Sequence, residues 1–454
     1  MRKPLEQIEP SEIYAIKWEI AGACKIDLDK GNVQILTWEE ACEKDRFAST
    51  IFSGFGPPDF IVSSVGSEKP QIEMLILPSI AYNLGFYACS FSGDIFRVDE
   101  HHHEKSLVFV CCEFKKTIHV MQSIVDDLKF FNCIFEEEVR FYQNSFEGKM
   151  HFLAGTFKKT VSFLGSIFKG EVHFDESEFQ KNVYFSEAAF FHLPSFFGVN
   201  FKGQIDLVNA DLNFGYGELK EQIGNSTKIA NDYRDSFRLI KNNLLKNNNT
   251  LDASQYHKME LYCKEIELAA RIKEAICPQK IKENGREKTL GSAEQSLLPL
   301  AMDFLQLWFY RKTSDHHTNL LRIIAWVVAC IGLFGYVLLG IFASDKEIAI
   351  PWFGVSEALS SVDSWIVSVG CLGIVVACLI VRWVEWLVGG IGLFLGVRIL
   401  TSRPSYLIDL FKGSLLDGRF DRWQNMTLLV HVVLLGLLLF SLQKTARKNT
   451  IIPS

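Results

Sequence analysis

FYQNSF at Phe141–Phe146 opens a run of closely related segments that decides the fold. The run continues with FLAGTF (Phe152–Phe157), FLGSIF (Phe163–Phe168), FDESEF (Phe174–Phe179), FSEAAF (Phe185–Phe190) and FFGVNF (Phe196–Phe201). Each segment begins 11 residues after the previous one. A fixed period of this kind is typical of repeat proteins, in which each unit packs mainly against its neighbours.

Within the repeat, large residues alternate at spacings of five and six, and a smaller or apolar residue lies two positions before each of them. Residues two apart in an extended chain point to the same face, so both members of a pair aim at one interior. An antiparallel sheet would need turns of variable length, whereas a parallel coil made of two 11-residue units keeps the register. The predicted structural ladder consists of Phe141, Phe146, Phe152, Phe157, Phe163, Phe168, Phe174, Phe179, Phe185 and Phe190.

Less regular copies extend this region back to Phe86 and forward to Leu212. Cys89, Cys112 and Cys133 occupy the small-residue position of their units, where we interpret them as small core side chains, since buried free cysteine behaves as a small hydrophobe. His101, His102 and His103 interrupt the repeat; three successive histidines cannot all face one site on a strand, which favours a loop over a metal site.

The residue pairs two apart resemble those of the pentapeptide-repeat proteins. The resemblance implies a right-handed, four-sided parallel β-helix over residues 86–212. The chain departs from that family because each 11-residue unit holds one residue more than two pentapeptides, and we interpret the extra residue as a bulged corner.

Residues 1–85 carry strand-like runs at Phe60-Ile61-Val62 and Met74–Leu77, and we expect them to cap the open end of the stack. Residues 213–277 predict a helical hairpin, broken at Asn247–Thr250, with Asp252 as the N-cap of the second helix. The order of these features resembles that of membrane-attached pentapeptide-repeat proteins of bacteria.

The last part of the chain is apolar. Residues 278–317 predict a linker followed by an amphipathic helix over Leu297–Tyr310, and residues 318–454 predict a transmembrane helical domain. Three runs approach or reach the length that crosses a bilayer: Ile323–Ala343, Trp365–Val381 and Met426–Leu442. The apolar stretch Leu387–Val397 is read as a fourth crossing, a re-entrant segment or an extension of the second helix, so the chain has three or four spans.

Arginine and tryptophan anchor helices at membrane surfaces, so Arg382, Trp383, Glu385 and Trp386 are the candidate interface residues. Arg311, Lys312 and Arg322 precede the first run, so we expect the soluble part to face the cytoplasm. The resemblance to membrane-attached proteins of bacteria implies that the membrane is the inner membrane. The basic C-terminal tail favours an even number of spans, but a fourth span would export the basic residues after Val397. The side of the C-terminus therefore stays open.

No catalytic motif appears, and we expect no enzyme activity and no cofactor. His257 and Glu260 share a helical face and could contribute to a metal site, but the sequence offers no identifiable third ligand. A filled stack has no cavity for a substrate, so the leading hypothesis is a membrane-tethered cytoplasmic scaffold that binds a protein through the outer faces of the β-helix. The resemblance to pentapeptide-repeat proteins implies two alternatives: a small ion-channel-like protein with a regulatory repeat domain, and a gyrase-binding DNA mimic.

The expected partners are the lipid bilayer and an unidentified protein, which includes a second copy of the chain. Nucleic acid is not expected, because the net charge of the 454 residues is −6.

Overall fold

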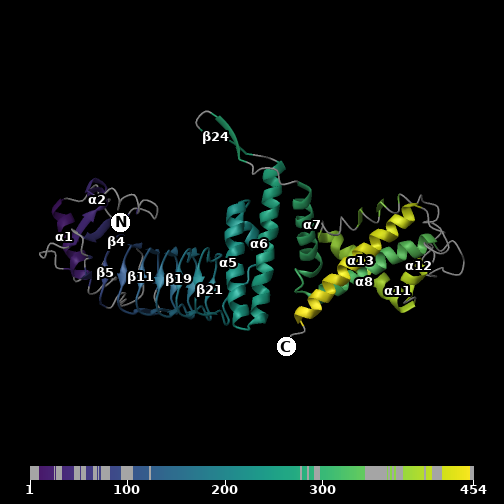
Figure 1. Ribbon diagram of the computed structural model, residues 1–454, viewed down its shortest axis with the longest axis horizontal. Helices are drawn as coiled ribbons and strands as arrows, with labels where there is room; N and C mark the ends of the chain where they lie inside the picture. Colours follow the sequence, from purple (N-terminus) through teal and green to yellow (C-terminus); the bar gives the residue numbers. More distant parts are fainter. Residues whose placement is uncertain are drawn as a thin grey trace. The chain divides into compact units, whose positions relative to one another are not determined.

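The computed structural model describes residues 10–24, 26, 33–44, 52, 58–64, 69, 71–72, 82–93, 106–121, 124–276, 279–283, 286–290, 297–342, 366, 369–370, 373–374, 382–402, 405–411 and 422–449. The chain divides into two compact units, Met1–Glu274 and Ala275–Ser454. The first contains a β-solenoid and the second is mainly helical (Figure 1).

The solenoid has four sheets, which we call A to D. Sheet A contains β1 (Val33–Thr37), β2 (Phe60–Ser64), β4 (Leu84–Tyr87), β6 (Leu107–Val110), β10 (Leu128–Phe131), β14 (Met150–Leu153) and β18 (Val172–His173). Sheet B contains β3 (Gln71–Ile72), β5 (Ser90–Phe91), β7 (Glu113–Phe114), β11 (Ile134–Phe135), β15 (Thr156–Phe157), β19 (Glu178–Phe179) and β22 (Asn200–Phe201). Sheet C contains β8 (Ile118–Met121), β12 (Val139–Tyr142), β16 (Val161–Ser162), β20 (Val183–Tyr184) and β23 (Ile205–Asp206). Sheet D contains β9 (Ile124–Val125), β13 (Ser145–Phe146), β17 (Ile167–Phe168) and β21 (Ala189–Phe190).

Strands of successive coils pair in parallel, which confirms the predicted parallel solenoid. Phe130 pairs with Phe152 and Val139 pairs with Val161, so one coil takes two 11-residue units. The pairing begins before Phe86, because β2 is parallel to β4. Among the described strands of the solenoid, β1 pairs antiparallel with β2 and the others pair in parallel.

Stacked phenylalanine rings fill the interior. The ten residues of the predicted ladder are buried, with at most 5% exposure at Phe190. Rings one coil apart are nearly parallel, as at Phe130 and Phe152, whose planes differ by 4° and whose centroids lie 4.8 Å apart. Neighbouring ladders meet edge to face, the other favourable geometry for aromatic rings.

Each unit turns one corner through a residue in the left-handed backbone conformation. Positive φ recurs every 11 residues through the regular part, and only two of these positions are glycine: Asn132, Gln143, Ala154, Gly165, Glu176, Glu187, Gly198 and Asn209. A residue in the left-handed backbone conformation bends the chain sharply at a modest energetic cost. The left-handed residue lies in the five-residue interval, as Gln143 does between Phe141 and Phe146, so it is not the extra residue that was predicted to form a bulged corner.

Where the small residue beside the corner is cysteine, serine or asparagine, its side chain supplies a hydrogen-bond donor. The Ser166 hydroxyl donates to the Phe141 carbonyl at 3.0 Å, and the Cys112 and Cys133 thiols donate to the carbonyls of Phe86 and Phe109. Burial raises the pKa of the Cys89 and Cys133 thiols, which keeps them protonated and able to donate. These cysteines therefore do more than fill space.

The N-terminal end is covered by apolar side chains of α1 (Pro10–Ala23), which place Ile16 and Ile20 in the solenoid core cluster (Figure 1). The short helix α2 (Trp38–Lys44) follows β1. The predicted strand at Met74–Leu77 and the histidines at 101–103 lie outside the described residues.

Three helices follow the last coil: α4 (Tyr216–Ile223), α5 (Thr227–Lys246) and α6 (Thr250–Ile276). Side chains of α5 satisfy backbone groups that no further coil pairs. Ser236 Oγ accepts from the Phe196 N–H at 3.0 Å; Asn243 accepts from the Ile205 N–H at 3.0 Å and donates to the Gly203 carbonyl at 2.9 Å. The hairpin thus closes the C-terminal end of the stack.

The second helix of the hairpin begins earlier than predicted. Asn249, not Asp252, accepts the N-terminal hydrogen bond, which comes from the backbone N–H of Asp252. Both residue types cap helices well, so their order along the chain left the choice open.

The second unit contains α7 (Leu297–Ser314), α8 (Leu320–Phe342), α11 (Arg382–Ser402), α12 (Tyr406–Phe411) and α13 (Arg422–Asn449), preceded by an antiparallel hairpin of β24 (Gln279–Glu283) and β25 (Arg286–Leu290) in the predicted linker. One described helix, Arg422–Arg447, is long and apolar enough to cross a membrane. Shorter apolar helices cover Leu320–Gly335 and Val388–Thr401. Most of the predicted span at 365–381 lies outside the described residues.

Helices α8 and α11 approach closely at glycines. A Cβ added to Gly396 would lie 2.0 Å from the Val328 carbonyl oxygen, and one added to Gly332 would lie 1.8 Å from the Gly392 carbonyl oxygen. Gly392 and Gly396 are four residues apart, a spacing that brings helix backbones together in membrane proteins. This packing accounts for Gly392 and Gly396 in the stretch Leu387–Val397, whose role the sequence alone left ambiguous.

Candidate functional site

The outer surface of the solenoid, rather than its interior, carries the groups available for contact. On three faces, lysines pair with carboxylates one coil away: Lys158 with Glu136 near sheet B, Lys169 with Glu147 near sheet D, and Lys149 with Glu171 beside sheet A. These pairs span 2.6 to 2.9 Å and offset one another's charge. Acidic residues on these faces are therefore largely matched by lysines.

Sheet C differs because two columns of mostly uncharged or aromatic residues run along its outer side. The first column, in strand register, is His119, Arg140, Ser162, Tyr184 and Asp206. The second holds Met121, Tyr142, Leu164, Ser186 and Val208, of which Met121, Leu164 and Val208 are 52%, 40% and 56% exposed. A depression of about 310 Å³ lies between the columns and is lined by Tyr142, Tyr184, Leu164 and Arg140 among others.

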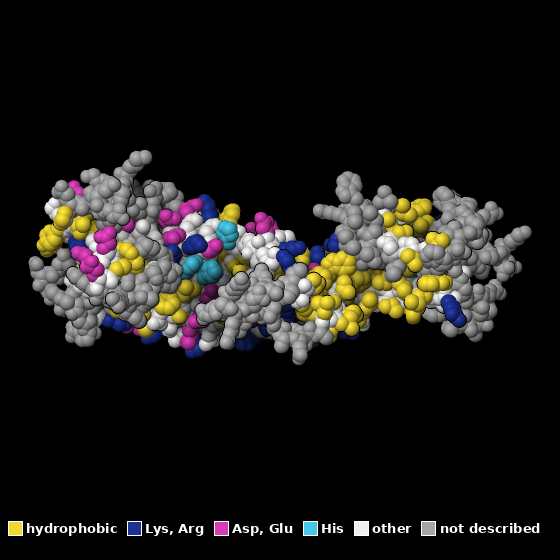
Figure 2. All heavy atoms as spheres, turned by 90° about the horizontal axis from the view of Figure 1, so that it is seen from above, with side chains coloured by type: hydrophobic (Ala, Val, Ile, Leu, Met, Phe, Trp, Pro, Cys, Tyr) yellow, Lys and Arg dark blue, Asp and Glu magenta, His cyan; other side chains and the backbone are white. Residues whose placement is uncertain are grey.

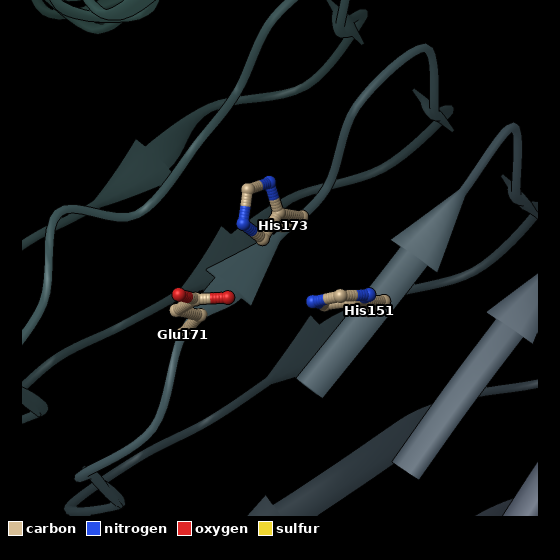
Figure 3. Close-up of side chains that lie close together, drawn as sticks. All are labelled: His151, Glu171 and His173. Carbon is tan, nitrogen blue, oxygen red and sulfur yellow. The ribbon is translucent and has the colours of Figure 1, made fainter. Parts of the chain in front are cut away.

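Sheet A carries a second cluster. His151 on β14 and His173 on β18 are register partners on adjacent coils, and Glu171 directly precedes β18. Met150 and Val172 point inward. Successive side chains of a strand point to opposite faces, so the next residues, His151 and His173, point outward. Figure 3 shows the two rings with the carboxylate beside them.

The geometry of this cluster is compact. The ring centroids of His151 and His173 lie 4.7 Å apart with planes inclined by 76°. One ligand-type atom from each of His151, Glu171 and His173 lies within 4.8 Å of the others. Two imidazoles and a carboxylate form a common ligand set for a divalent transition metal.

Each member of the cluster has a distinct environment. Asp175 Oδ2 lies 3.3 Å from Nδ1 of His173, while Lys149 Nζ lies 2.9 Å from Oε2 of Glu171. Nε2 of His151 is buried and has no hydrogen-bond partner among the residues that the structure describes. Burial, followed by the charges of His173, Lys129 and Lys149, lowers the pKa of His151 to about 4, so this ring is neutral near pH 7.

Sequence reasoning missed this cluster. Periodicity identifies the inward positions, whereas His151 and His173 occupy outward ones. The available signal was their separation of 22 residues, which equals one coil and therefore makes them neighbours.

The other predicted candidates are placed differently. Arg382, Trp383, Glu385 and Trp386 lie at the start of α11, and their side chains are outside the described part of the structure. His257 Nδ1 lies 3.1 Å from Glu260, which also pairs with Arg238 and Lys241, so this pair belongs to an ion-pair network between α5 and α6.

Comparisons with protein-family models, with curated proteins and with solved structures return no match for this chain.

Proposed function

We propose that the protein is a membrane-tethered scaffold whose solenoid binds a protein partner through its outer surface. The observation that carries this proposal is the aromatic interior: stacked rings occupy the space inside the coils, so the described solenoid meets other molecules from outside. A resemblance to the membrane-attached pentapeptide-repeat proteins of bacteria, based on the residue pairs of the repeat, supports the same function.

The helical unit supports the tether. Helix α13 has the length and composition of a membrane span, and α8 and α11 bring apolar surface and glycine-mediated packing to the same unit. Hydrophobic side chains gather on its described surface (Figure 2). We propose a multi-pass arrangement in the inner membrane, with the basic residues before α8 holding the solenoid on the cytoplasmic side.

Sheet C is the face that we propose for the partner. Arginine and tyrosine are enriched at protein interfaces, while lysine and glutamate are depleted. Arg140, Tyr142 and Tyr184 line the depression together with the exposed Leu164 on this sheet. Arg140 pairs there with Glu138 of the same coil, whereas the three other faces carry lysine–carboxylate pairs between coils. A partner with an apolar centre and a polar rim fits these columns.

Site-specific photocrosslinking in intact membranes tests the partner face. A benzophenone side chain at Leu164 or Tyr184 should yield one adduct of constant mass, and the same probe at Lys158 beside sheet B should yield none. Equal adducts from both faces, or none from sheet C, would contradict the proposal.

Alkaline extraction tests the tether independently. The full chain should stay in the membrane pellet, and a chain ending at Glu274 should move to the supernatant. Release of the full chain by alkali would show that it is attached only peripherally.

A further inference from the structure

We propose that His151, Glu171 and His173 bind a divalent transition metal ion of the zinc class on the outer face of sheet A. The three side chains supply two imidazole nitrogens and one carboxylate oxygen, grouped within 4.8 Å. Zinc accepts this ligand set and keeps a fourth position open for water or an external ligand. This site is separate from the partner face proposed on sheet C, and its ligand is a metal ion rather than a protein.

The backbone already holds the two histidines in place. His151 and His173 are register partners in a parallel ladder, so their Cα positions are set by the hydrogen bonds of β14 and β18. Ligand atoms around a tetrahedral zinc lie roughly 3.3 Å apart, given bonds of about 2.0–2.1 Å. Rotation of the side chains about χ1 and χ2 is the movement that brings the three atoms to this spacing.

Asp175 provides the outer contact that metal-bound histidines usually have. When His173 donates its Nδ1 proton to Asp175, the lone pair of Nε2 is left for the ion. Asp175 is itself fixed, because it accepts hydrogen bonds from the Ser195 hydroxyl and from the Phe197 N–H. The orientation of His173 is thus set from the far side of the ring.

The buried nitrogen of His151 points independently to a ligand. Buried polar atoms in native proteins nearly always have a partner, and Nε2 of His151 has none among the described residues. A bound cation would satisfy it. Figure 3 shows the ring of His151 directed toward the carboxylate of Glu171.

Two lysines oppose a cation at this position. Lys149 binds one oxygen of Glu171, which leaves the other oxygen for the ion, and Lys129 pairs with Asp127 at 3.0 Å. The carboxylates of Glu171, Asp175 and Asp127 outnumber these two ammonium groups. Removal of the Lys149 charge should therefore strengthen metal binding.

Metal titration of the purified full chain in detergent tests the site. With Co²⁺ as the probe, the wild type should develop visible d–d bands without the near-ultraviolet band of thiolate ligands, and Zn²⁺ should displace the cobalt. The double variant His151→Ala/His173→Ala should lose these bands, and Asp175→Asn should weaken binding by about 10–100-fold. His119→Ala, on the outer side of sheet C, is the matched control and should bind as the wild type does.

Lys149→Met keeps the test decisive if the double variant folds poorly, because it leaves all three ligands in place and should raise the affinity for Co²⁺. The proposal is overturned if the wild type shows no d–d bands, if a thiolate band appears instead, if the double variant binds like the wild type, or if Lys149→Met does not tighten binding.

Discussion

Phe135 lies directly against Phe157 one coil further along, with ring centroids 4.5 Å apart and planes inclined by only 1°. The same relationship recurs in the ladders through Phe130, Phe141 and Phe146. The rings therefore form continuous columns, and each one contributes to two coil interfaces. This is the physical basis of a long, thin fold without a conventional globular core.

Removal of one ring should be costly. Phe157→Ala removes a fully buried side chain between two stacked neighbours and should lower the free energy of unfolding by about 3–5 kcal/mol. Phe191→Ala, whose side chain is 62% exposed, is the matched control and should change it by less than about 0.5 kcal/mol. Denaturant unfolding of the full chain in detergent, followed by circular dichroism, measures both; equal losses would contradict the ladder account.

The left-handed corners predict an unusual order of substitutions. At Gln143, where φ is 55°, glycine should raise stability by up to about 1 kcal/mol, because it adopts this backbone conformation without strain. Valine at the same position should cost about 1–2 kcal/mol. Thermal unfolding of the two variants gives the order directly, and a valine variant as stable as the glycine variant would argue against a strained corner.

Asn243 tests the closure of the C-terminal end. Asn243→Leu leaves the Ile205 N–H and the Gly203 carbonyl without their partner and should cost about 2–4 kcal/mol. Asn243→Asp keeps an acceptor for Ile205 but loses the donor to Gly203, so its loss should be smaller. Hydrogen exchange at the Ile205 amide should quicken in the leucine variant more than in the aspartate variant; unchanged exchange would mean that the hairpin does not close the stack.

Glu260 makes the helical hairpin sensitive to acid. Burial opposes its ionised form, but hydrogen bonds from His257, Lys241 and Arg238 prevail and lower its pKa to about 2. A depressed carboxyl pKa stabilises the fold above the unfolded value near 4.5 and loses that contribution as pH falls toward 2. The loss should be on the order of 2 kcal/mol.

Unfolding measured between pH 6 and pH 2.5 checks this prediction. Glu260→Gln should be less stable than the wild type at pH 6, and the difference between them should shrink with acidification. Parallel pH profiles for the two proteins would rule out the proposed role of Glu260.

The glycine contacts of the helical unit predict position-dependent effects. Gly396→Leu places a side chain where the α8 backbone lies and should separate α8 from α11 or unfold the unit. Gly389→Leu is the matched control, because no atom of another described element lies within 4 Å of its added Cβ. Crosslinking of cysteine pairs introduced on α8 and α11 should fall only in the Gly396 variant; similar yields in both variants would contradict the close packing.

Much of the solenoid could be predicted because its determinants are local and repeated. The 11-residue period of the phenylalanines predicted the parallel coil. The left-handed corners, however, lie in the five-residue intervals and not at the extra residue, where a bulged corner was predicted. The hydrogen bonds from the Ser166 hydroxyl and the Cys112 and Cys133 thiols to backbone carbonyls of the previous coil were not predictable. They depend on the path of the backbone at the corner, which only the structure reveals. The same holds for Ser236 and Asn243, which act only because α5 lies across the last coil.

The candidate metal cluster shows a different limit. Outward positions vary freely along a repeat, so no periodic signal marks His151, Glu171 or His173. Their proximity follows only from the coil length, which joins residues 22 positions apart. The glycines of α11 were ambiguous for a related reason: a glycine-rich apolar stretch suits both a loop and close packing, and the position of α8 decides between them.

The central claim is that the membrane-held solenoid acts through contacts on sheet C, and co-purification of the full chain in mild detergent tests it most directly. The account predicts that a second protein accompanies the wild type at a fixed ratio and is lost from the variant Leu164→Glu/Tyr184→Arg, while both chains unfold at the same temperature. A second protein retained at the same ratio by the variant would contradict the claim, as would a wild-type chain that purifies alone.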